Sequence, residues 1–109
     1  MLTEEEVRDL LAPRVLGAGE QGLGSELDVV DLQVVVEGRA FTVYAEVVAP
    51  DGRWSVAVKL GSSEMNIFNG RPPEDLVAWV ARLLRILLDE WWHTKGRERR
   101  SAAMGVRLD

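Results

Sequence analysis

The stretch that most constrains the fold is a long, mostly apolar segment at residues 73–94. Pro73 suits the first turn of a helix, and Glu74 and Asp75 follow where the helix dipole favours negative charge. Lys95-Gly96 supplies a signal for the end of the helix. On a helical wheel the apolar residues cover about 240°, whereas a helix on one sheet needs little more than about 100°. We therefore expect one long helix that is covered on two sides.

A polar stripe occupies the rest of this helix, with Arg82, Arg85, Asp89 and His93 beside Ala78. A sheet can cover one side of the apolar arc. The N-terminal helix and the loop at 61–72 offer little area for the other, so we favour a second copy of the chain. Tryptophan is enriched at interface centres, and the interface candidates are Trp79, Ile86, Trp91 and Trp92. The alternative is that the tryptophans belong to the core of a single chain.

Three runs of alternating apolar residues predict an antiparallel meander over about 27–37, 40–49 and 54–60. Gly38-Arg39 and Pro50-Asp51-Gly52 are the turn signals between them. The 61–72 loop could add a short fourth strand. The expected apolar faces are Val30, Leu32, Val34 and Val36, then Phe41, Val43, Ala45 and Val47, then Trp54, Val56, Val58 and Leu60.

A short helix is expected at the N-terminus, where Thr3 and Glu6 have the spacing of a capping box. Pro13 should end or kink this helix near Leu11. We therefore expect an α+β domain over 1–96: a short N-terminal helix, a three- or four-stranded antiparallel meander, and the long helix packed on one sheet face. Residues 97–109 show no periodicity and are expected to form a flexible basic tail.

Composition excludes several classes of protein. The chain has 109 residues, no cysteine and a net charge of −5, so disulfides, zinc ribbons and thiol nucleophiles are ruled out. Residues 1–51 hold eleven acidic and three basic side chains, a net of −8, which disfavours nonspecific binding to nucleic acid. No signal peptide or membrane span is visible, and we expect a cytoplasmic protein. Eleven arginines against two lysines resemble the codon usage of a GC-rich bacterium or its phage.

A glycine-rich segment, Gly17-Ala18-Gly19-Glu20-Gln21-Gly22, matches the dinucleotide fingerprint by letter. The fingerprint needs a strand before it and a helix after it, because the helix N-terminus binds the pyrophosphate. Here a helix precedes it and a strand follows. We therefore expect residues 17–25 to be a mobile linker that binds no nucleotide.

The remaining polar motifs each have a plain structural explanation. His93 lies at the end of the long helix, where an imidazolium suits the dipole, although Asp89 and Glu90 are near enough for a weak metal site. Glu26, Asp28 and Asp31 lead into the first strand and are interpreted as protection of a sheet edge. Asp28 and Asp31 would point to opposite faces of a regular strand. Ser62-Ser63-Glu64 has no general base assigned to it, so we expect no catalytic residue, cofactor or metal.

The order helix, three-stranded meander, helix is similar to that of the double-stranded-RNA-binding domain. Lysines at the start of that family's second helix hold the groove phosphates. The corresponding residues here, Pro73-Glu74-Asp75, are acidic, so the resemblance in topology does not imply RNA binding. The sequence favours a non-catalytic protein–protein interaction module, as a homodimer and possibly with another protein as well. The alternative is a nucleic-acid-associated regulator that uses the basic run Arg97–Arg100.

Overall fold

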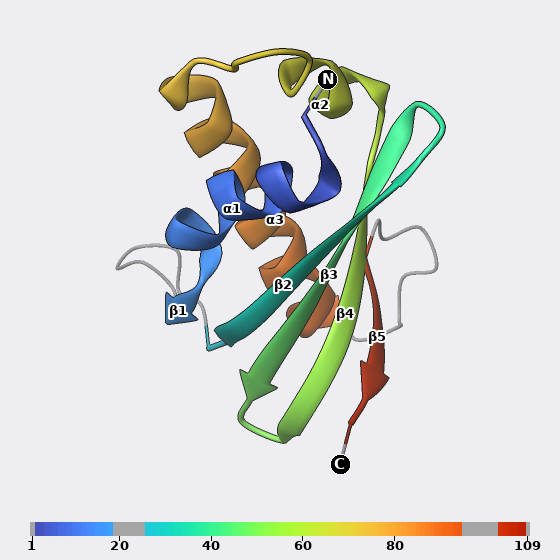
Figure 1. Ribbon diagram of the computed structural model, residues 1–109. Helices are drawn as coiled ribbons and strands as arrows, with labels where there is room; N and C mark the ends of the chain where they lie inside the picture. Colours follow the sequence, from blue (N-terminus) through green and yellow to red (C-terminus); the bar gives the residue numbers. More distant parts are fainter. Residues whose placement is uncertain (1, 19–25, 95–102, 109) are drawn as a thin grey trace.

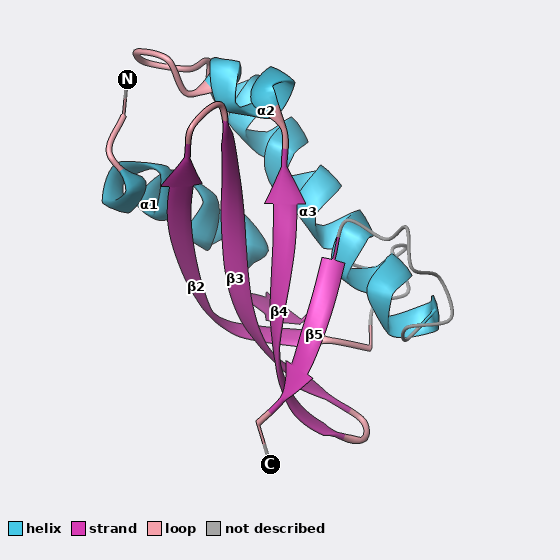
Figure 2. Cartoon of the chain, turned by 90° about the vertical axis from the view of Figure 1, so that its right-hand side faces the viewer, coloured by secondary structure: helices cyan, strands magenta, loops and turns pink. Residues whose placement is uncertain are grey.

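The computed structural model describes residues 2–18, 26–94 and 103–108. It contains a single antiparallel sheet with the helices on one face (Figures 1 and 2). The helices are α1 (Glu4–Val15), α2 (Ser62–Ile67) and α3 (Glu74–Thr94), and the strands are β1 (Gly17–Ala18), β2 (Asp28–Glu37), β3 (Ala40–Ala49), β4 (Gly52–Leu60) and β5 (Ala103–Arg107). The strands lie in the sheet in chain order, each antiparallel to the next. The α+β class, the meander and the long helix on one sheet face are confirmed.

The core lies between the sheet and the pair α1 and α3. The inward faces of β3 and β4 are those expected from alternation, and a turn with Gly38 in the left-handed region joins β2 to β3. Phe68, which follows α2, closes one end of the core with its ring edge-on to Phe41 at 5.8 Å between centroids. Buried apolar side chains of these two strands are Phe41, Val43, Ala45, Val47, Ala49, Val56, Val58 and Leu60.

Helix α1 begins as expected and ends later than expected. Thr3 Oγ1 accepts from the Glu6 backbone N–H at 3.2 Å, and Glu6 Oε1 accepts from the Thr3 N–H at 3.1 Å, which completes the capping box. The helix passes through Pro13 and continues to Val15, so the expected end near Leu11 is wrong. Val15 is buried in the core, and tertiary packing outweighs the backbone hydrogen bond that proline removes.

A β-bulge in β2 changes which side chains face the core. The register shifts between Val29 and Asp31, where β2 pairs with β3. Val29 is therefore buried and Val30 exposed, the reverse of the expected alternation. Asp28 and Asp31 pair with Val48 and Glu46, two positions apart on β3, so both acids lie on the outer face of the sheet rather than on opposite faces.

Two segments that were expected to be a loop and a tail form regular secondary structure instead. Residues 62–67 form α2, not a fourth strand. The additional strand is β5, of five residues, which pairs with β4 inside the segment expected to be a flexible tail. Gly105 of β5 lies so close to Trp91 of α3 that an added Cβ would overlap the indole ring. The strand at this edge of the sheet therefore packs closely against α3.

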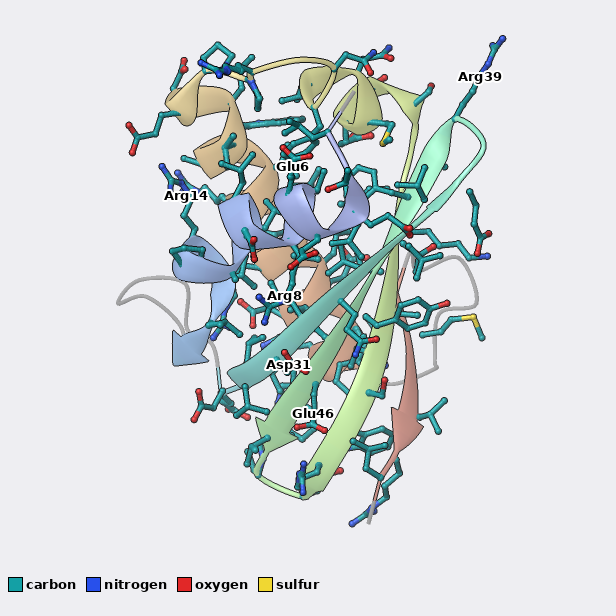
Figure 3. All side chains as sticks on the ribbon, in the orientation of Figure 1. Glu6, Arg8, Arg14, Asp31, Arg39 and Glu46 are labelled. Atoms are coloured by element: carbon teal, nitrogen blue, oxygen red, sulfur yellow. The ribbon has the colours of Figure 1, made fainter. Side chains whose placement is uncertain are left out.

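The opposite edge of the sheet is closed by α1. Arg8 Nε donates to the Leu32 carbonyl at 2.9 Å, and Glu4 Oε2 accepts from the Val36 N–H at 2.8 Å. Figure 3 shows Arg8 beside Asp31, to which its Nη2 is 3.3 Å away. Charged side chains along an edge strand discourage pairing with another sheet. Asp31 and its partner Arg8 therefore place charge along this edge, and edge protection stays a prediction.

Candidate interaction surface

The buried face of helix α3 is narrower than the apolar arc of its sequence. Its buried side chains span about 140° of the helical wheel at 100° per residue. They are Val77, Val80, Ala81, Leu84, Arg85, Leu88, Trp91 and Trp92. The sheet and α1 therefore account for only part of the apolar surface that the sequence places on this helix.

The tryptophans of α3 fall into two groups. Trp91 and Trp92 are buried within the chain, whereas Trp79 remains half exposed. The Trp91 ring packs edge-on against Trp54 of β4 at 5.3 Å between centroids. Trp92 Nε1 donates to Glu26 Oε2 at 2.7 Å. Of the four interface candidates, Trp79 and Ile86 lie on the surface, and Trp91 and Trp92 belong to the core of the single chain.

Arg85 is buried, which is a correction to its expected place on the polar stripe. Only 5% of it is exposed. Its Nη1 donates to the carbonyls of Val15 and Gly17, both at 3.3 Å, and its Nη2 donates to the carbonyl of Leu27 at 2.5 Å. These carbonyls come from the end of α1, from β1 and from the entrance to β2. Arg85 therefore bonds to the backbone on both sides of residues 19–25 along the chain. Those residues lie outside the described part of the chain.

A continuous apolar strip is left on the surface of α3, and we call it the α3 stripe: Leu76, Trp79, Leu83 and Ile86. Leu76 is 39% exposed, Trp79 50% and Ile86 43%, while Leu83 is half-buried. The residues recur at intervals of three, four and three, which is the a/d spacing of a helix that packs against another helix. The stripe lies about 150° around the helix from Arg85, on the side of α3 away from α1.

A charged flank borders the stripe. Asp75, Arg82 and Asp89 follow one another at seven-residue intervals, in the position next to the a/d seam that carries charges in helix pairs. Arg82 is exposed and Asp89 half exposed. Within the described ranges, neither Arg82 nor Asp89 forms an ion pair. Negative, positive and negative side chains therefore alternate along one side of the stripe.

Other exposed apolar side chains lie on the outer face of the sheet, on and just after α1 (Leu10 and Leu16), and on and just after β5. Val30, Tyr44 and Val48 are separated on the sheet by charged neighbours such as the Glu46–Arg53 ion pair at 2.9 Å. Met104, Val106 and Leu108 are exposed near the end of the chain. Single exposed apolar residues are normal on soluble proteins. The α3 stripe differs because its members follow one helix at regular spacing.

The polar motifs have local roles where the structure describes them. Glu64 Oε2 accepts from the Gly61 N–H at 3.1 Å at the start of α2, so Ser62-Ser63-Glu64 belongs to a helix start. His93 is exposed at the end of α3. Among the described residues, no three His, Asp or Glu side chains are grouped to hold a metal ion. An open depression of about 470 Å³ beside α1 contains Glu6, which caps its own helix, and Asp9, which pairs with Arg8.

Two further predictions fall on residues that the structure does not describe. The glycine-rich segment is described only at Gly17–Ala18, which forms β1 against Val29 and Asp28. Its remaining residues and the basic run Arg97–Arg100 lie outside the described ranges. The linker, the absence of nucleotide binding and the nucleic-acid alternative therefore stay predictions.

The chain matches no family model, no curated protein and no solved structure. Of the helices described, none has the length and apolar character needed to cross a bilayer. The α3 stripe is the most distinctive feature on the described surface of this chain.

Proposed function

We propose that this chain is a non-catalytic protein–protein interaction module that forms a homodimer through α3. The observation that supports this is the α3 stripe, three turns of helix with apolar residues at a/d spacing left uncovered by the described part of the fold. Burial of apolar area is the main driving force of protein association. A partially exposed tryptophan near the middle of such a strip is the residue type that contributes most at interfaces.

The size of the stripe sets the expected affinity. From Leu76 to Ile86 the strip is about 15 Å long at 1.5 Å per residue. A strip of this length buries less than the roughly 800 Å² per partner of a standard interface. We therefore expect a dissociation constant on the order of micromolar rather than nanomolar.

Replacing Ile86 with glutamate should disrupt the dimer. A carboxylate at the centre of an apolar contact has no partner there and must lose water on association. We expect the dissociation constant to rise about thirtyfold or more, which corresponds to about 2 kcal/mol. Light scattering coupled to size exclusion measures the molar mass of both proteins at equal concentration.

The matched control is Val30→Glu, on the bulge of β2. Val30 is 45% exposed, close to the 43% of Ile86, but it lies on the outer face of the sheet rather than on α3. This variant should keep the mass of the unaltered chain. If both variants remain dimers, the contact lies elsewhere and the proposal is wrong.

A further inference from the structure

We infer that the two copies pack their α3 helices antiparallel about a two-fold axis, with Arg82 of each subunit paired to Asp89 of the partner subunit. This inference rests on the proposed homodimer and specifies its geometry. A second copy is the occupant because each helix carries both halves of the contact: an apolar a/d strip and a flank on which opposite charges lie seven residues apart. A two-fold contact requires this kind of self-complementary surface.

Overlap between the helices restricts how they can be aligned. In an antiparallel pair, an a residue of one helix faces a d residue of the other. One alignment places Leu83 opposite Ile86 of the partner subunit and overlaps nearly all of the 21-residue helix. Moving the partner by one heptad, so that Trp79 faces Leu83 of the partner subunit, shortens the overlap by about five residues. The first alignment therefore overlaps more of the helix, whereas the shifted one sets the four stripe residues opposite one another, so the charges decide between them.

The charges favour the first alignment. It brings Arg82 beside Asp89 of the partner subunit, and the two-fold axis repeats this pair, so two opposite-charge contacts flank the apolar seam. The shifted alignment brings Arg82 beside Arg82 of the partner subunit and Asp75 beside Asp89 of the partner subunit. Like charges side by side oppose association. Arg82 and Asp89 have no intrachain ion pair among the described residues, so both are available to a partner.

The position of Glu90 agrees with this alignment. Glu90 continues the spacing of the stripe, yet it is charged and exposed. In the first alignment it faces Trp79 of the partner subunit, whose indole N–H is a hydrogen-bond donor. In the shifted alignment it lies opposite a residue before the start of α3. The first alignment therefore gives the Glu90 carboxylate a hydrogen-bond donor, and the shifted alignment leaves it outside the overlap, in water.

Charge reversal tests the inference. Arg82→Asp and Asp89→Arg each place two like-charge contacts in the dimer, so each alone should raise the dissociation constant at least about tenfold. The double variant, R82D together with D89R, restores opposite charges and the original net charge. It should dimerise within about threefold of the unaltered chain, since the number and the signs of the contacts are the same. Sedimentation velocity on each protein measures the constants.

Mixing the two single variants gives an independent readout. A heterodimer of the Arg82→Asp and Asp89→Arg chains has opposite charges at both contacts, so an equimolar mixture should associate more tightly than either variant alone. If the unaltered chain dimerises and the double variant stays monomeric, this alignment is wrong although the proposed dimer stands. If the unaltered chain is a monomer, both the alignment and the dimer are overturned.

Discussion

Replacing Arg85 with leucine is expected to lower the free energy of unfolding by about 3 kcal/mol or more. The guanidinium donates to three backbone carbonyls from two parts of the chain, Val15 and Gly17 at the end of α1 and Leu27 before β2. Leucine would fill part of the volume and leave these carbonyls without their donor, and unpaired buried carbonyls cost about 1–3 kcal/mol each. Domains of this size are stable by only about 5–15 kcal/mol, so the loss would be a large share of the total.

Guanidinium denaturation followed by tryptophan fluorescence measures the change. Arg82→Leu is the matched control, because it makes the same substitution on the exposed side of the same helix and should change stability by no more than about 0.5 kcal/mol. The comparison is made at a protein concentration where every sample is monomeric, so that association does not add to stability. Equal losses in the two variants would show that the hydrogen bonds of Arg85 contribute nothing specific.

Replacing Gly105 with valine should release β5 from the sheet. A side chain at this position overlaps the indole of Trp91, so the strand or the tryptophan must move. We expect a loss of about 2–3 kcal/mol, within the range found for overpacked sites. Truncation after residue 96 removes the same strand and should cost a similar amount, which reverses the expectation from sequence that residues 97–109 are a flexible tail.

Melting temperature and the emission maximum of the tryptophans provide two readouts of this change. Undocking of β5 exposes Trp91 and should shift emission to longer wavelength, because the ring moves from the core into water. Gly61→Ala is the control, since an added Cβ there meets only Glu64 Oε2 at an ordinary 3.5 Å. A Gly105→Val protein as stable as the control would contradict the close contact between β5 and α3.

Local sequence signals predicted the elements whose stability is mostly local. The capping box of Thr3 and Glu6 and the alternation in β3 depend on residues near one another in the chain, and both are found in the structure. The bulge at Val30 was not predictable because it depends on pairing with β3. Pro13 was expected to end or kink α1 near Leu11, but the helix continues to Val15, which packs in the core.

Long-range contacts decide the features that the sequence did not reveal. The strand at 103–107 is short, contains a glycine and has no clear alternation, so only its pairing with β4 defines it. Arg85 lies at the border of the apolar arc, and nothing in its neighbours indicates that three distant carbonyls converge on it. The width of the arc did predict uncovered apolar surface, but the wheel could not separate Trp79 from Trp91, because that separation depends on where β4 and β5 lie.

Sedimentation equilibrium of the unaltered chain tests the proposed dimer most directly. The chain has a mass of 12.1 kDa. With an affinity on the order of micromolar, the average mass should rise from near this value towards twice this value as the concentration increases from about 0.5 µM to about 200 µM. A mass of 12.1 kDa at every concentration would contradict the account, and the α3 stripe would then be surface that two copies of this chain do not share.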